Sequence, residues 1–251
     1  MSDDAPKKKK KRRRRRKKTT PQNRVLTGLR VAGLALGGLF AFSILWPAVY
    51  RVAAPPGTFL MLQRKLSGDV IHHPWTRIED ISPYLVTAVI AAEDTRFCLH
   101  DGIDFEAIDK ALEEAERGRK LRGASTISQQ TAKNAFLWNG GGWFRKAGEA
   151  WMTVLIETFW PKRRIMEVYL NIAEWGDGNF GAEAAAQARF GKSAKNLTRQ
   201  EAALLASVLP NPHKWRVDPP GPYVRSRSHT VSARMYEVRR DGLDACVLRV
   251  K

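Results

Sequence analysis

Cysteine is scarce in this sequence, since only Cys98 and Cys246 occur among 251 residues. This scarcity excludes the framework of several disulfide bonds that stabilises many small secreted domains. Because no characteristic spacing links the two cysteines, we expect two free thiols. The sequence also lacks long stretches in which polar and apolar residues alternate, which argues against a β-rich fold. It has no internal repeats, which argues against a repeat protein. With 43% hydrophobic residues, the chain can still bury the core of one ordinary domain.

Acidic residues are nearly absent from residues 1–30, which contain 14 Lys or Arg against Asp3 and Asp4. This segment therefore carries +12 of the formal net charge of +18, and residues 31–251 carry the remaining +6. Its unbroken basic run, residues 7–18, has no apolar surface to bury and should be solvated. Such a run would be typical of a nuclear signal or a nucleic-acid patch if it stood alone.

Charge is absent from all 20 residues of the segment that follows, 31–50. A helix of this length spans about 30 Å and matches the hydrocarbon core of a membrane, so we predict a transmembrane helix. A cleaved signal peptide is the alternative, because Ala53 and Ala54 provide small residues. Its apolar region would be shorter, however, at about 7 to 15 residues.

The charges around this helix predict its orientation. Basic residues favour the cytoplasmic side, so residues 1–30 are predicted to be a cytoplasmic tail and the chain beyond Arg51 to lie outside the cytoplasm. Trp46 and Tyr50 lie where interfacial aromatic side chains are common. We therefore interpret the tail as a topology determinant that attracts anionic lipid heads, and we predict no nucleic-acid binding.

Helical periodicity continues through most of the remaining sequence, which predicts a mainly α fold. The membrane helix ends before Pro55 to Gly57, and Ser82 is predicted to cap a helix that begins at Pro83. The chain is accordingly divided into a linker at 51–64, a domain at 65–240 and a C-terminal tail at 241–251. Further helices are predicted at 104–117, 125–138, 143–159, 162–173, 180–190, 198–208 and 222–240.

Four short polar clusters interrupt the helical pattern. They are EDTRFCLHDG at 93–102, GASTISQQ at 123–130, RKAGE at 145–149 and RIMEVYLN at 164–171. In this order they resemble the motifs EDxxFxxHxG, GxSTxxQQ, RKxxE and I/L-M/L-ExYLN of the family-51 peptidoglycan glycosyltransferases. The resemblance covers about residues 65–240, and it implies a lysozyme-like glycosyltransferase domain behind the single transmembrane helix.

Glu93 and Asp94 are adjacent, so on a helix they point about 100° apart and only one can face a cleft. The resemblance implies that Glu93 is the general base that deprotonates the 4-hydroxyl of the acceptor. It also places Asp94, Phe97 and His100 at the substrate site, although Asp94 and His100 are expected mainly to hold the turn. For the two carboxylates alone, a solvated surface pair is the alternative.

Thr126, Gln130 and Lys133 recur at helical spacing and would form a polar stripe on one face of a helix. A hydroxyl, an amide and an ammonium suit a ligand that is rich in phosphate and hydroxyl oxygens. The resemblance implies contacts with a diphosphate-linked sugar donor. An exposed polar face without a ligand is the alternative.

Arg145 and Glu149 lie one helical turn apart, and Lys146 flanks them. An ordinary surface ion pair would explain this spacing and would contribute only about 0.3 kcal/mol. The resemblance implies instead that Arg145, Lys133 and Lys146 neutralise the diphosphate leaving group. Glu149 would be a second catalytic residue that orients these cations or a divalent metal. We expect no required cofactor and no dedicated metal ligands, although a divalent cation such as Mg²⁺ could take part.

Three further segments complete the pattern. Glu167 and Asn171 lie one turn apart on a helix with an otherwise buried face, so we expect them to tie that helix to the catalytic end. Residues 174–181, with three glycines, are predicted to form a loop. Residues 136–144 combine four aromatic residues with three glycines, which excludes a regular element. They either pack in the core or form a flap in the outer leaflet beside a lipid tail.

Together these features predict a membrane-anchored peptidoglycan glycosyltransferase. By the resemblance, it transfers a growing glycan strand from undecaprenyl diphosphate to lipid II, with inversion to a β-1,4 linkage. Its expected partners are lipid II, the lipid-linked strand, the membrane and cell-wall or division proteins, and its expected location is the bacterial inner membrane with the domain in the periplasm. No SxxK motif of a transpeptidase occurs. The alternatives are a lysozyme-like hydrolase, which would use Glu93 and Glu149 as paired carboxylates, and a non-catalytic scaffold of the cell-wall machinery.

Overall fold

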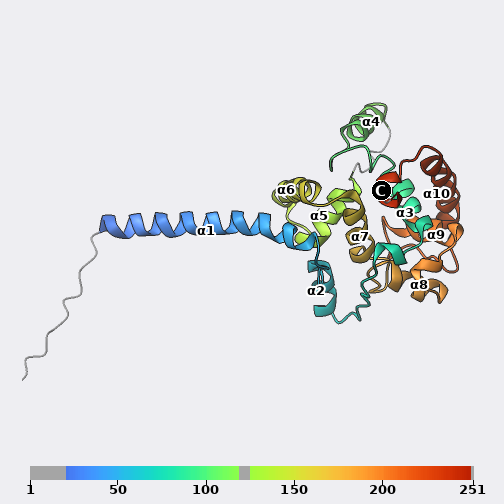
Figure 1. The fold of residues 1–251 in the computed structure, drawn as a ribbon, viewed down its shortest axis with the longest axis horizontal. Coiled ribbons are helices and arrows are strands. Elements are labelled where there is room, and N and C mark those ends of the chain that lie inside the picture. Colours follow the sequence, from blue (N-terminus) through green and yellow to red (C-terminus); the bar gives the residue numbers. More distant parts are fainter. Residues whose placement is uncertain (1–20, 119–124, 250–251) are drawn as a thin grey trace, which may run out of the picture. The chain divides into compact units, whose positions relative to one another are not determined.

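A computed structural model describes residues 21–118 and 125–249, which are predominantly helical (Figure 1). Within these ranges the chain forms two isolated β-bridges and no strand. The prediction of a mainly α fold is therefore confirmed. The chain divides into two compact units, Met1–Ser43 and Ile44–Lys251.

Helix α1, Pro21–Tyr50, contains the predicted transmembrane segment and begins before it. Its portion Val25–Tyr50 is long and apolar enough to cross a membrane, and most of its side chains are exposed. An exposed apolar surface of this length fits a helix whose side chains face lipid. The basic run at 7–18 lies outside the described residues.

Each helix that the periodicity predicts beyond Pro83 is present, with ends that differ by a few residues. These helices are α3 Pro83–Glu93, α4 Phe105–Glu116, α5 Ile127–Phe136, α6 Gly142–Phe159, α7 Lys162–Ile172, α8 Ala182–Phe190, α9 Arg199–Val208 and α10 Pro222–Arg240. The 3₁₀ helix η1, Ile78–Asp80, precedes α3, and η2, Ala194–Asn196, lies between α8 and α9.

Capping residues fix where these helices begin. The Ser82 hydroxyl accepts a hydrogen bond from the Tyr84 N–H at 3.3 Å, and Pro83 occupies the first position of α3, as predicted. Thr198 and Glu201 form a capping box at α9, because each side chain satisfies a backbone N–H of the other residue.

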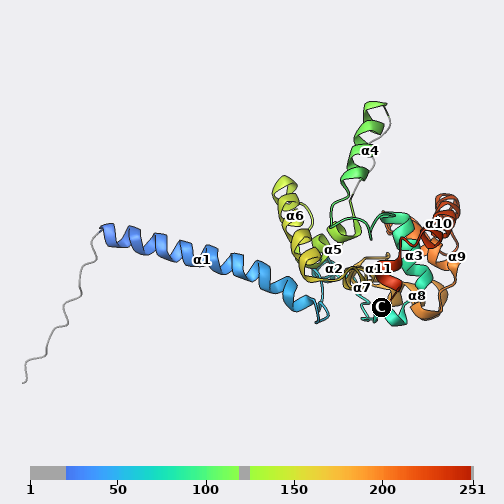
Figure 2. The same cartoon turned by 45° about the horizontal axis from the view of Figure 1, so that its top comes forward.

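Helix α3 forms the centre of the core. Residues 85–91 are all buried, and α9 and α10 pack against this helix (Figure 2). Helices α5, α6 and α7 pack with one another and form a second group beside the first. Because a helix enclosed by close packing cannot shift freely, the end of α3 is a fixed point of the domain. Glu93 is its last residue.

Two short helices lie in segments that the sequence left unassigned. Helix α2, Phe59–Leu66, falls largely within the predicted linker and buries Met61. Helix α11, Ala245–Leu248, lies in the C-terminal tail and packs against α7.

Cys246 of α11 forms a disulfide bond with Cys98, with the two Cα atoms 5.6 Å apart. The prediction of two free thiols is therefore wrong. The cysteines are 148 residues apart in the sequence, and only the docking of α11 against the folded domain brings them together. No local spacing could have indicated this pair.

Residues 174–181 form the predicted loop after α7. At Gly178 the backbone angle φ is +74°, and a Cβ atom would lie 2.1 Å from the Val70 carbonyl oxygen, so only glycine fits. This close approach lets the His72 N–H donate to the Gly178 carbonyl at 3.0 Å. The loop is thereby attached to the extended chain that precedes α3.

Helix α4 stands away from the other domain helices in both views (Figures 1 and 2). None of its residues is buried, and Phe105 and Leu112 are among its exposed side chains. Asp104 caps it by accepting from the Ala107 N–H at 3.0 Å. Residues 119–124 lie outside the described residues, and with them the first two positions of the second motif.

Candidate active site

Glu93 lies in the wall of a cleft of about 790 Å³. Gln130 Nε2 donates a hydrogen bond to Glu93 Oε2 at 3.0 Å, and Arg227 Nη2 lies 3.8 Å from Oε1. Oε1 is buried and accepts no hydrogen bond from the described residues. Burial raises the pKa of the Glu93 carboxyl, and the charge of Asp94 adds to the rise, whereas the amide and the guanidinium oppose it. Glu93 thus combines an increased proton affinity with unused accepting capacity.

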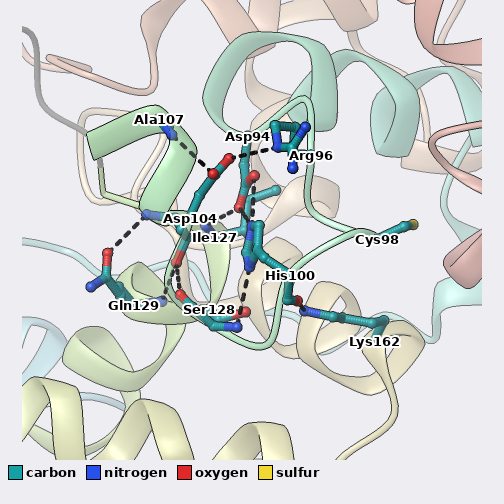
Figure 3. A network of polar contacts seen from close by, with 12 residues as sticks. Asp94, Arg96, Cys98, His100, Asp104, Ala107, Ile127, Ser128, Gln129 and Lys162 are labelled. Carbon is teal, nitrogen blue, oxygen red and sulfur yellow. Dashed lines mark hydrogen bonds and ion pairs between the residues drawn. The ribbon is translucent and has the colours of Figure 1, made fainter. Parts of the chain in front are cut away.

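Asp94 and His100 hold the loop that follows Glu93 (Figure 3). The Asp94 carboxylate accepts from His100 Nε2 at 3.0 Å and from the Ile127 N–H at 3.0 Å. His100 Nδ1 accepts from the Gly102 N–H at 3.1 Å, so the ring hydrogen lies on Nε2. The expectation that these residues hold the turn is confirmed. Asp94 thereby also attaches the loop to the first residue of α5, and it lines a small pocket of about 120 Å³ beside Glu93.

Phe97 and Thr126, two of the predicted substrate-binding residues, both have structural roles. Phe97 is fully buried, with the Lys162 ammonium 4.7 Å from its ring centre. Thr126 caps α5, so it does not continue the polar stripe of that helix. Its hydroxyl accepts from the Gln129 N–H at 3.1 Å and donates to the Gly102 carbonyl at 2.5 Å. Burial closes off Phe97, whereas Thr126 also lines a small pocket of about 120 Å³ beside Glu93.

The predicted cationic group is assembled between α5 and α6. Arg145 Nη1 lies 2.8 Å from Glu149 Oε2, and the Lys146 ammonium bonds to Glu149 Oε1. Burial lowers the pKa of the Lys133 amine, and the two neighbouring cations add to the effect, while Glu149 opposes it. Lys133 has no ion-pair partner within the described ranges. Positive charge that is partly buried and incompletely neutralised is suited to an anionic ligand.

Gln130 connects the carboxylate with the cations, because it lines both the Glu93 cleft and a second pocket of about 280 Å³ that contains Lys133. Helix α10 also lines the larger cleft, and its lining residues include Arg227 and Arg234. The sequence interpretation missed these two arginines. Residues seven positions apart lie on the same face of a helix, and this spacing could have indicated that the two arginines act together. Helix α10 contains several other basic residues, however, so the spacing did not single out this pair.

Among the residues that the structure describes, one group has the composition and spacing of a metal site. Asp94, His100 and Asp104 each offer a ligand atom, and these atoms lie within 4.8 Å of one another. The chain already uses this group, however, because Asp104 accepts from the Ala107 N–H and lies 3.4 Å from Arg96 Nε. Hard oxygen ligands would suit Mg²⁺, but binding here would compete with the bonds that hold the loop.

Glu167 and Asn171 are scaffold residues, as predicted. The Glu167 carboxylate accepts from the Ile78 N–H at 3.1 Å, and Asn171 Oδ1 accepts from the Thr76 N–H at 2.7 Å. They thereby tie α7 to the segment that leads into α3.

Gly102 allows the loop after Glu93 to pack closely against α6. Its φ is +93°, and a Cβ atom at this position would lie 2.6 Å from a methyl carbon of α6.

These features define a class of protein. A helical domain that follows an apolar N-terminal helix presents a buried carboxylate of raised pKa in one pocket, and Lys133 of the cationic group in a second pocket that shares Gln130 with the first. Such a site can accept a proton from a hydroxyl and stabilise an anionic leaving group. It is the site of a group-transfer enzyme that acts on a charged donor.

Comparison with known proteins identifies the family. Residues 62–236 match the family model described as Transglycosylase, and the chain belongs to this family. Proteins named biosynthetic peptidoglycan transglycosylase are 54% identical in Rhodospirillum centenum over 88% of this chain and 96% of the relative, and 54% identical in Caulobacter vibrioides over 83% and 93%. The Pseudomonas aeruginosa protein of that name is 50% identical over 80% and 89%. Family membership confirms the resemblance seen in the four motifs.

Proposed function

We propose that the protein is a peptidoglycan glycosyltransferase that polymerises lipid II and releases undecaprenyl diphosphate. The observation that carries this proposal is the connection, through Gln130, between a carboxylate of raised pKa and a partly buried cationic group. Family membership supports the same reaction.

Glu93 acts as the general base. Its carboxylate takes the proton from the 4-hydroxyl of the acceptor sugar while that oxygen attacks the anomeric carbon of the donor. The new carbon–oxygen bond forms as the bond to the diphosphate breaks, and the bonding electrons leave with the diphosphate. One displacement inverts the anomeric centre, so no covalent glycosyl-enzyme is required. A base whose pKa is raised toward neutral pH takes up this proton more readily than an ordinary glutamate.

Lys133, Arg145 and Lys146 stabilise the departing diphosphate. Negative charge grows on its oxygens as the bond breaks, and fixed cations in a partly buried site stabilise that charge without reorganising. Glu149 holds Arg145 and Lys146 through its two oxygens. Its role is therefore to orient cations, and we propose that these side chains, rather than a bound metal, neutralise the leaving group.

Membrane attachment suits lipid-linked substrates, and a second surface of the domain supports it. In residues 136–144, Phe136 is buried, but Trp138, Trp143 and Phe144 are exposed, the latter two by 80% and 72%. Exposed aromatic side chains at a surface favour the interfacial region of a bilayer. The expectation that this segment contains no regular element is wrong at its ends, because Phe136 is the last residue of α5 and residues 142–144 form the first turn of α6. Of its four aromatic residues only Phe136 belongs to the core, and we propose that the exposed three contact the outer leaflet.

The proposed location is the bacterial inner membrane, with the N-terminus in the cytoplasm and the domain in the periplasm. The basic charge before α1 supports this orientation. The bond between Cys98 and Cys246 supports it independently, because disulfides persist in oxidising compartments such as the periplasm. Cell-wall or division proteins remain proposed partners.

A glycan hydrolase is less consistent with the site. Most glycoside hydrolases place two carboxyl groups at the bond they cleave. The candidate second group, Glu149, has both carboxylate oxygens bonded to Arg145 and Lys146, so it is held by two cations rather than presented to a glycosidic bond. A neutral glycan would also gain little from the cations.

Polymerisation of labelled lipid II by the detergent-purified protein tests the proposal. We expect a ladder of long glycan strands from the unaltered protein. Lys133→Met should lower the rate by about 100-fold or more, because one preorganised charge is lost. Lys110→Met, on exposed α4, is the matched control and should not change it. Fragments released from preformed glycan would instead indicate the hydrolase, and no reaction from folded protein would indicate the scaffold.

A further inference from the structure

Behind the candidate base lies a buried tyrosine that the mechanism above does not use. Tyr169 of α7 is 1% exposed, and its hydroxyl lies 3.3 Å from Gln130 Oε1. The other end of the same amide, Gln130 Nε2, donates to Glu93 Oε2 at 3.0 Å. Three side chains from three helices therefore form one chain of hydrogen bonds that ends at the carboxylate.

The direction of these bonds is fixed by chemistry. An amide oxygen can only accept, so the Tyr169 hydroxyl must donate to Gln130. Burial raises the pKa of this hydroxyl well above its ordinary value, and the carboxylates of Glu93 and Asp94 add to the rise. The hydroxyl consequently keeps its proton and remains a donor throughout the range in which the enzyme works.

An amide has two orientations, and only one of them suits a carboxylate neighbour. With the observed orientation, the NH₂ group faces Glu93 and stabilises its ionised form. The opposite orientation would place the amide oxygen against a carboxylate oxygen, and two acceptors would repel each other. The carboxylate therefore favours the first orientation, and in that orientation the Tyr169 hydroxyl donates to the amide oxygen and holds the amide in place.

We propose that Tyr169 is a positioning residue for glycosyl transfer. It holds the Gln130 amide so that the amide donates to Glu93 Oε2, which fixes the carboxylate and leaves Oε1 without a hydrogen bond. This inference rests on the proposed role of Glu93 as the base. It assigns a function in the reaction to a residue of the fourth motif, which the sequence interpretation treated as scaffold.

Tyr169→Phe in the full-length protein removes the hydroxyl and keeps the ring that fills the core. We expect kcat for lipid II polymerisation to fall about tenfold, in keeping with the loss of one hydrogen bond, with little change in KM. The acidic limb of the pH profile should also move to higher pH. The hydrogen bond from Gln130 lowers the pKa of Glu93, whereas burial and the charge of Asp94 raise it. A less ordered amide lowers this pKa less, so the pKa of Glu93 should rise. Arg227, the charged neighbour on α10, stays in place and continues to lower this pKa.

Two comparisons separate positioning from general damage. Tyr236→Phe, on the exposed face of α10, is the matched control and should behave as the unaltered protein. In a Gln130→Ala background, Tyr169→Phe should have no further effect on kcat, because the amide that the Tyr169 hydroxyl holds is absent. An unshifted acidic limb, an unchanged kcat, or an equal loss in both backgrounds would overturn the inference. Failure of the unaltered protein to polymerise lipid II would instead contradict the proposed function.

Discussion

The bond between Cys98 and Cys246 leads to a prediction whose size can be worked from the structure. It closes a loop across a sequence separation of 148 residues, which spans most of the domain. In the chain-entropy model a loop of this length lowers the stability of the unfolded state by about 5 kcal/mol, and measured values for native disulfides run from about 2 to 5 kcal/mol. For a domain of this size, 1 kcal/mol corresponds to about 2 to 4 °C in Tm. Reduction should therefore lower the Tm by about 4 to 20 °C.

The assay is thermal unfolding of the purified full-length protein, followed by circular dichroism with and without a reducing agent. The variant Cys98→Ser/Cys246→Ser is the matched control, because it should melt at the lower temperature and should not respond to the reductant. Activity should fall as well, since Cys98 lies between Asp94 and His100 in the loop that follows the base.

Thiol titration gives the result that would refute this reasoning. Protein isolated without a reductant and then denatured should have no titratable thiol. Two thiols per chain would show that the pair does not form and would restore the expectation drawn from the sequence. An unchanged Tm on verified reduction would show that the bond contributes nothing to stability.

Three further predictions concern the site and its surface. The base must be ionised and burial raises the pKa of Glu93, so kcat/KM should rise with pH, and the midpoint of this rise should lie above the pKa of an ordinary glutamate. Burial lowers the pKa of Lys133, so kcat/KM should fall again at alkaline pH, with a midpoint below the pKa of an ordinary lysine. A midpoint at the ordinary glutamate value would contradict the first part. Removal of divalent cations with a chelator should change turnover by less than about twofold, and loss of activity restored by Mg²⁺ would assign the diphosphate to a metal. Lipid vesicles should protect amides of residues 138–144 from hydrogen exchange, and equal exchange with and without vesicles would contradict contact with the leaflet.

The helices could be predicted because their signals are local. Apolar periodicity, Ser82 before Pro83 and the capping box of Thr198 and Glu201 each act within a few residues, and each helix forms where they indicate. The motif clusters likewise predicted which residues supply the candidate base and the cationic group, since the residues of each cluster are close in the sequence.

The remaining features depend on contacts between distant parts of the chain. Arg227 reaches Glu93 only because α10 packs against α3. Tyr169 reaches Gln130 through the packing of α7 on α5, and the disulfide requires the docking of α11. Spacing alone also misled in one case, because Thr126 shares the helical repeat of Gln130 and yet belongs to the cap rather than the helix.

The most direct test of the account is the turnover of lipid II by Glu93→Gln beside the unaltered protein. The substitution keeps the size of the side chain and its bond to Gln130, and it removes the basic oxygen. Burial raises the pKa of Glu93 in the folded state above its pKa in the unfolded state. The Glu93 carboxyl therefore stabilises the fold when the pH is below its pKa in the unfolded state, and this stabilisation is lost as the pH rises through its pKa in the folded state. At neutral pH the neutral amide should therefore not lower the Tm. We predict a folded protein whose polymerisation rate is about 10²- to 10⁴-fold lower. A folded Glu93→Gln variant that polymerises lipid II within about tenfold of the normal rate would contradict the assignment of Glu93 as the base.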